Sequence, residues 1–155
     1  MDIYLQIEWI KYLTILITLF GTYLGYQQYK INQYKVKLDL YEKRYNVVSG
    51  YKKTISILLR NGTLTDDELR DYLISTKESI YFFDDLVNRH INDVYEKFIS
   101  IQMWTLELKT NTELDIPLRK DYSEKSKETL TYFNRLIKSS DEKYFKKYLD
   151  FTKLS

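Results

Sequence analysis

The sequence predicts an all-α protein, in which an N-terminal transmembrane helix continues into a cytoplasmic bundle of about four or five helices. The 18 residues from Tyr12 to Tyr29 carry no charge. As a helix they span roughly 27 Å, which is close to the hydrocarbon thickness of a bilayer. Through the rest of the 155-residue chain, apolar residues recur at spacings of three and four, which is typical of amphipathic helices. We therefore expect a membrane anchor over residues 1–29 and a helical bundle over residues 30–155.

The anchor has a dense apolar centre between aromatic ends. Trp9 and Tyr12 precede this centre and Tyr26 and Tyr29 follow it, and amphipathic rings prefer the two membrane interfaces. The residues that we expect to span the membrane include Tyr12, Leu13, Ile15, Leu16, Ile17, Leu19, Phe20, Gly21, Leu24 and Gly25. The four-residue spacing of the two glycines also permits a close contact between helices. The alternative is that this stretch is a buried core helix of a soluble bundle.

Basic residues follow the anchor and predict its orientation. Residues 30–53 hold seven lysines and arginines against Asp39 and Glu42, whereas Lys11 is the only basic residue before the span. Positive charge stays on the cytoplasmic side, so we expect the N-terminus outside and the bundle in the cytoplasm. Three lysines are the expected contacts with lipid head groups: Lys30, Lys35 and Lys37. Positive-inside topology alone would also explain this charge.

The segment 30–49 reads as a basic stalk helix with a heptad seam. The seam comprises Ile31, Tyr34, Leu38, Tyr41, Tyr45 and Val48, at spacings of 3, 4, 3, 4 and 3. We expect it to pack against later helices of the same chain, and a homodimeric coiled coil is the alternative. The candidate interface residues on this segment are Tyr34, Leu38, Tyr41, Arg44 and Tyr45.

Local signals predict where the next helices begin and end. Gly50 indicates a kink or a break, and a helical piece over residues 51–60 ends at Asn61-Gly62. Thr65 and Glu68 have the spacing of a capping box, which predicts a short helix to about Ile74. A second box at Ser75–Glu78 predicts a restart.

The longest helix of the bundle is expected from Lys77 to about Lys109. Its apolar stripe is Ile80, Phe83, Val87, Ile91, Val94, Phe98, Ile101, Trp104 and Leu108. Residues 110–117 read as a loop that ends at Pro117, and a helix over about 118–138 follows. The last helix begins near Ser139 and has the stripe Tyr144, Phe145, Tyr148, Leu149 and Phe151.

The composition offers few residues that could serve in catalysis or metal binding. There is no cysteine, no Gly-rich phosphate loop and a single histidine, His90, which we expect at an exposed bundle edge. Asp84-Asp85 is expected to cap a helix end or to be exposed charge rather than to hold a cation. Seven tyrosines lie at or beside apolar positions and are expected at the rim of the core: Tyr41, Tyr45, Tyr81, Tyr95, Tyr132, Tyr144 and Tyr148. We predict no catalytic residue, no cofactor and no metal ligand.

Three stretches carry a resemblance to known proteins: LDLYEKRYNVV at 38–48, ESIYFFDDLVNRHINDVYEKF at 78–98 and YFKKYLDF at 144–151. They resemble segments of small bacterial and prophage membrane proteins of uncharacterised function. The resemblance implies one N-terminal transmembrane helix followed by a cytoplasmic helical domain. It brings no catalytic residues with it.

Together these observations favour a non-enzymatic interaction module tethered at the inner face of the cytoplasmic membrane. The expected partners are membrane lipid, a partner protein of unknown identity and, through the seam, a homo-oligomer. Nucleic acid and small-molecule substrates are not expected, because residues 54–155 carry a slight excess of acidic residues and no motif for either ligand. The alternative is a prophage-type exclusion or anti-phage effector that oligomerises and perturbs the bilayer.

Overall fold

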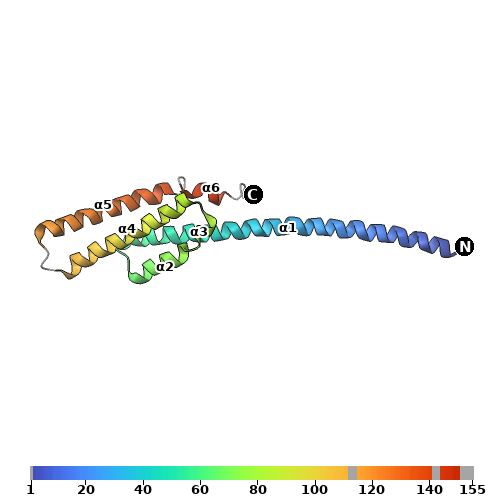
Figure 1. Ribbon diagram of the computed structural model, residues 1–155, viewed down its shortest axis with the longest axis horizontal. Helices are drawn as coiled ribbons and strands as arrows, with labels where there is room; N and C mark the ends of the chain where they lie inside the picture. Colours follow the sequence, from blue (N-terminus) through green and yellow to red (C-terminus); the bar gives the residue numbers. More distant parts are fainter. Residues whose placement is uncertain (1, 112–114, 141–143, 151–155) are drawn as a thin grey trace. The chain divides into compact units, whose positions relative to one another are not determined.

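The computed structural model describes residues 2–111, 115–140 and 144–150, with side chains from Trp9 onward and without that of Ser140. The helices are α1 (Asp2–Asn61), α2 (Asp66–Thr76), α3 (Ser79–Phe82), α4 (Asp85–Thr110), α5 (Ile116–Ser140) and α6 (Lys146–Leu149) (Figure 1). These described ranges contain no strand, so the predicted all-α class is confirmed. Two compact units divide the chain, an N-terminal unit (Met1–Asp39) and a C-terminal unit (Leu40–Ser155). Within the part described, none of the helices is both long enough and apolar enough to cross a membrane.

Helix α1 passes through Gly50 without interruption, so the predicted break there is wrong. The reason for a glycine at this position is packing, because an added Cβ would collide with the Ser75 side chain of α2. The predicted end of the helix is confirmed. Gly62 has a φ of 75°, which favours glycine, and its amide donates to the Leu58 carbonyl at 2.7 Å.

The capping box at the start of α2 is confirmed. The Glu68 amide donates to Thr65 Oγ1 at 3.3 Å, and the Thr65 amide donates to Glu68 Oε2 at 2.8 Å. These two bonds satisfy two of the amides that every helix start leaves without an intrahelical partner. The second predicted box is wrong, because Glu78 precedes α3 without a side-chain cap.

The single helix expected over Lys77–Lys109 is also wrong, because the backbone is extended at Phe83 (φ −130°, ψ 162°) and at Asp84 (φ −76°, ψ 172°). The apolar stripe is nevertheless largely confirmed on α4, where the buried members are Val87, Ile91, Val94, Phe98 and Ile101. Trp104 and Leu108 are half-buried. Ile80 lies on α3 and is exposed. The break at Phe83 and Asp84 interrupts the helical periodicity, so Ile80 does not share the buried face of α4.

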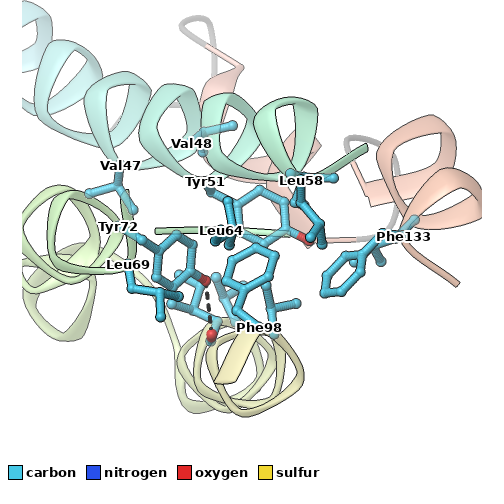
Figure 2. Close-up of a cluster of buried hydrophobic side chains, with 14 of the residues drawn as sticks. Val47, Val48, Tyr51, Leu58, Leu64, Leu69, Tyr72, Phe98 and Phe133 are labelled. Carbon is cyan, nitrogen blue, oxygen red and sulfur yellow. Dashed lines mark hydrogen bonds between the residues drawn. The ribbon is translucent and has the colours of Figure 1, made fainter. Parts of the chain in front are cut away.

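The core of the C-terminal unit is rich in aromatic side chains. Figure 2 shows Phe98 between Tyr72 of α2 and Phe133 of α5. The Phe98 ring stacks on Phe133 at 4.9 Å between centroids and meets Tyr72 edge-on at 5.0 Å. The Tyr72 hydroxyl donates to the Ile91 carbonyl at 2.9 Å, so its polar end is satisfied inside the core. Burial accordingly raises the pKa of Tyr72 well above its usual value.

The last part of the chain follows the prediction only partly. Helix α5 matches the helix expected over 118–138, and Pro117 lies in its first turn, where a missing amide costs nothing. The last helix was expected to begin near Ser139, but α6 covers only Lys146–Leu149. Phe145 is fully buried, whereas Tyr144, Tyr148 and Leu149 are half-buried. Phe151 of the predicted stripe lies outside the described residues.

Candidate functional site

The N-terminal unit carries a long run of exposed apolar side chains. Each has between 50% and 73% of its surface exposed, and they are Trp9, Ile10, Tyr12, Leu13, Ile15, Leu16, Ile17, Leu19, Phe20, Tyr23, Leu24, Tyr26 and Tyr29. They include all the large side chains that the sequence predicts to span a membrane. They cover most of the circumference of α1, and the remaining face over this stretch carries small and hydroxyl residues, namely Thr14, Thr18, Gly21, Thr22 and Gly25. Apolar surface of this extent marks a region that another molecule or a lipid phase covers.

The polar groups of this stretch are satisfied within the helix. Thr14 donates to the Ile10 carbonyl, Thr18 to the Thr14 carbonyl and Thr22 to the Thr18 carbonyl, each at 2.8 Å. A hydroxyl bonded to the preceding turn loses most of the penalty for leaving water. An added Cβ at Gly21 or Gly25 would meet no atom within 4 Å, so both glycines face open space in the described N-terminal unit.

The three lysines predicted to meet lipid differ in exposure: Lys30 and Lys35 are exposed and Lys37 is half-buried. Lys30 Nζ lies 5.1 Å from the centroid of the Tyr26 ring, which is a cation–π distance. Lys30, Ile31, Tyr34, Lys35 and Leu38 line a shallow hollow of about 260 Å³. The lining of the hollow is almost wholly apolar, so the two lysines contribute their methylene stems to it.

The predicted packing of the stalk seam against later helices is wrong for most of its residues. Ile31, Tyr34, Leu38 and Tyr45 are exposed, Tyr41 is half-buried, and only Val48 is buried. Ile31, Tyr34 and Leu38 belong to the N-terminal unit, where α1 is the only described element. Their side chains are exposed along this unit.

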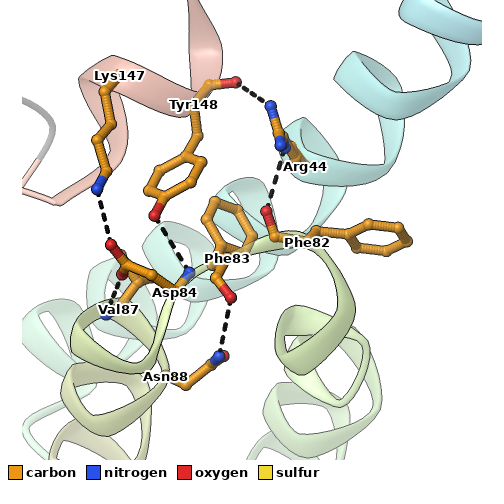
Figure 3. A network of polar contacts seen from close by, with 8 residues as sticks. All are labelled: Arg44, Phe82, Phe83, Asp84, Val87, Asn88, Lys147 and Tyr148. Carbon is orange, nitrogen blue, oxygen red and sulfur yellow. Dashed lines mark hydrogen bonds and ion pairs between the residues drawn. The ribbon is translucent and has the colours of Figure 1, made fainter. Parts of the chain in front are cut away.

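Arg44 lies at a junction of the C-terminal unit and not on an open interface. Figure 3 shows its guanidinium between two backbone carbonyls. Nε donates to the Phe82 carbonyl at 3.2 Å and Nη1 to the Tyr148 carbonyl at 3.4 Å. The guanidinium also lies 5.2 Å from the centroid of the Tyr148 ring. Arg44 thus joins α1 to the end of α3 and to α6, and partial burial lowers its pKa.

Asp84 forms the other half of this junction. Its Oδ1 accepts from the Val87 amide at 3.1 Å, which caps α4 as predicted for the Asp84-Asp85 pair. Its Oδ2 accepts from Lys147 Nζ at 2.7 Å, and its backbone amide donates to the Tyr148 hydroxyl at 3.1 Å (Figure 3). The hydrogen bond from Lys147, followed by those involving Tyr148 and Val87, lowers the pKa of Asp84 to about 2.

This depressed pKa predicts a loss of stability in acid. The pKa of Asp84 is about 2 in the folded chain against 3.8 for the free group, so its contribution is complete above pH 4 and is lost as the pH falls toward 2. Because 42% of the Asp84 side chain is exposed, the effect should be only about 1 kcal/mol. Urea unfolding of the full chain in mild detergent at pH 6 and pH 3 measures it.

Asp84→Asn should reduce the difference between the two pH values, because the amide oxygen still caps α4 while the charge is gone. Asp85→Asn is the matched control, since it removes a neighbouring carboxylate and leaves the contacts of Asp84 in place. An acid loss that is the same in wild type and Asp84→Asn would contradict the assignment.

His90 lies in the core, so its predicted place at an exposed bundle edge is wrong. It is 6% exposed, its Nε2 lies 2.8 Å from the Tyr51 hydroxyl oxygen, and its ring stacks on Tyr144 at 3.8 Å between centroids. These partners come from α1 and from the segment before α6, so no local pattern reveals them. Among the described residues no group of three acidic or histidine side chains could hold a metal ion.

The tyrosines occupy two kinds of position. The expected place at the rim is confirmed for Tyr41, Tyr95, Tyr132, Tyr144 and Tyr148, which are half-buried. Tyr45 and Tyr81 are exposed instead, at 53% and 77%. Sequence reasoning missed the two that are fully buried, Tyr51 and Tyr72. The period of the apolar residues could have found Tyr51, because it lies four residues before Ile55 and three after Val48.

Comparison of the chain with protein-family models, with curated proteins and with solved structures found no match. The resemblance to small bacterial and prophage membrane proteins therefore stays a prediction.

Proposed function

We propose that this chain is a non-catalytic helical module that residues 9–29 tether to the cytoplasmic membrane and whose C-terminal unit binds a partner protein at the inner face. The observation that carries the proposal is the run of exposed apolar side chains around α1 between Trp9 and Tyr29. Covering one such side chain fully is worth about 1.5–3 kcal/mol, so leaving all of them in water would be very costly. Lipid covers an apolar surface that extends around most of a helix, whereas one helical partner covers only a stripe.

Two further features support the lipid as the covering phase. The threonine hydroxyls that lower the mean hydropathy of the stretch are bonded to carbonyls of the preceding turn. A bilayer core tolerates such satisfied hydroxyls. Exposed Lys30 and Lys35 follow the stretch immediately and suit the anionic surface of the cytoplasmic leaflet, which supports an orientation with the N-terminus outside.

The binding role of the C-terminal unit follows from how its polar groups are used. His90, Arg44 and Asp84 are all engaged in contacts that join helices or cap them. Exposed apolar side chains remain on α3 and at the start of α4, namely Ile80, Tyr81 and Leu86. Exposed apolar side chains close together are typical of contacts with another protein.

We expect the full chain to sediment with membranes and to resist extraction by alkaline carbonate. An integral helix stays in the bilayer under these conditions because its apolar surface has no other cover. A chain that is soluble without detergent and monomeric would overturn the tether.

The binding role has its own test. A tagged chain is solubilised from native membranes in mild detergent, and the proteins that it retains are compared with those retained by Ile80→Ser with Tyr81→Ser. A protein retained by the wild type and lost from the variant supports the module. Identical profiles from the two chains would overturn the assignment of α3 as the binding surface.

A further inference from the structure

The heptad seam of the stalk continues toward the N-terminus through the apolar stretch. At alternating spacings of 3 and 4 it comprises Ile10, Leu13, Ile17, Phe20, Leu24, Gln27, Ile31, Tyr34 and Leu38. Every apolar member of this extended seam is between 48% and 68% exposed. The extended seam is thus a nearly continuous apolar stripe of exposed side chains on one side of α1.

The seven-residue repeat of the extended seam indicates what kind of helix can pack along it. A straight α-helix has 3.6 residues per turn, so a stripe with a strict seven-residue repeat drifts around it by about 20° per heptad. A second helix with the same repeat removes this drift, because the two wind around each other in a left-handed supercoil. Four heptads reach the length at which such a pattern indicates a coiled coil.

Gln27 identifies the partner as a second copy of this chain. It is the one polar residue in the extended seam, it is half-buried, and its Nε2 donates to the Tyr23 hydroxyl at 3.0 Å. In a parallel pair without offset, Gln27 meets the same amide in the second copy, which supplies both a donor and an acceptor. An antiparallel or shifted pair would set this amide against aliphatic side chains, at the cost of burying the amide hydrogen-bonding groups that the Tyr23 hydroxyl does not satisfy.

We propose that the N-terminal unit pairs with a second copy of this chain as a parallel, in-register, two-stranded coiled coil along Ile10–Leu38. Ile10, Ile17 and Ile31 occupy three of the five a positions, with Leu24 and Leu38 at the other two, and β-branched residues at a favour two strands. At roughly 60–120 Å² for each buried apolar side chain, the eight apolar members bury about 500–1,000 Å² per chain. A standard stable interface buries about 800 Å² per partner.

The charged residues beside the extended seam contribute little to the free energy of pairing, whether favourable or unfavourable. In the parallel pair Lys37 lies across from Glu42 of the second copy, and Lys30 lies across from Lys35 of the second copy. Exposed pairs of this kind are individually worth only about 0–1 kcal/mol, so the apolar seam and Gln27 decide the pairing.

The pairing does not depend on the tether proposed above. It covers one stripe of α1 and leaves the apolar side chains on the other sides, such as Tyr12, Ile15 and Leu19, for the lipid. A two-stranded pair and a membrane segment are therefore compatible in one helix.

The natural absence of cysteine makes the proposal directly testable by disulfide cross-linking of the full chain. Ile17→Cys, Ile31→Cys and Leu38→Cys are expressed separately, and the cell fraction that holds the chain is oxidised with copper phenanthroline. Equivalent a positions of a parallel pair lie within the Cα separation of about 4.4–6.8 Å that a disulfide needs. We expect most of the chain to run as a covalent dimer in all three variants on a non-reducing gel.

Ile15→Cys and Asn32→Cys are the matched controls, because both positions are off the seam and should cross-link at least five-fold less. Cross-linking at only one of the three seam positions would indicate an antiparallel pair and would overturn the proposal. Equal cross-linking at seam and control positions would overturn it as well, because random collision then explains the product. Carbonate extraction of the same variants reports on the tether separately.

Discussion

Replacing both Leu16 and Leu19 with arginine should remove the chain from the carbonate-resistant membrane fraction. A single arginine at the centre of a membrane helix costs about 2.5–3.5 kcal/mol on insertion scales, so the pair costs roughly twice that. Leu16 and Leu19 are 68% and 65% exposed, and the exchange breaks no packing within the chain. Release from the membrane would therefore report on what surrounds α1 and not on unfolding. The measurement is an immunoblot of the pellet and the supernatant after carbonate extraction.

The matched control places two arginines on the C-terminal unit. Met103 and Leu106 of α4 are exposed to nearly the same degree, at 60% and 59%. Met103→Arg with Leu106→Arg adds the same charge and should leave the chain in the membrane fraction. If the Leu16 and Leu19 variant stays in the membrane as fully as this control, residues 12–29 do not lie in the bilayer.

Phe98→Ala should lower the free energy of unfolding of the C-terminal unit by about 3–5 kcal/mol. The Phe98 side chain is fully buried, and its ring contacts Phe133 of α5 and Tyr72 of α2. Removing the ring leaves a cavity between three helices that cannot all move inward together. Urea unfolding of the full chain in mild detergent, followed by circular dichroism, measures the loss.

Leu106→Ala is the control for Phe98→Ala, because it shortens an exposed apolar side chain of the same helix and should change stability by less than about 0.5 kcal/mol. Equal losses from the two variants would show that the apolar stripe of α4 is not the centre of the core.

The sequence predicts well what depends on neighbouring residues. The stripe from Val87 to Ile101 follows from helical periodicity, and α4 buries all five of its members there. The start of α2 follows from the chemistry of two side chains, Thr65 and Glu68, that lie three residues apart. Each signal is complete within one or two helical turns.

Features that depend on residues far apart in the sequence could not be predicted in the same way. The break before α4 is held by Phe83 against Phe145 and by the contacts of Asp84 with Lys147 and Tyr148. Asp84 alone offers a local signal, as a capping residue three positions before Val87. The burial of His90 depends on Tyr51, 39 residues away in the chain. No pattern around His90 indicates this partner, and a polar residue next to Ile91 among Asn88, Arg89 and Asn92 is expected to be exposed.

Because α1 and α2 approach closely, the side chains at positions 50 and 75 compete for the same space. Because a Cβ at Gly50 would occupy the space of the Ser75 side chain, the two positions share room for one small side chain. A change at one position is therefore tolerated only together with a compensating change at the other, and the pair should vary jointly among related chains. Joint variation at positions 50 and 75 would then mark the relatives that keep α1 and α2 in this contact, however little else they share.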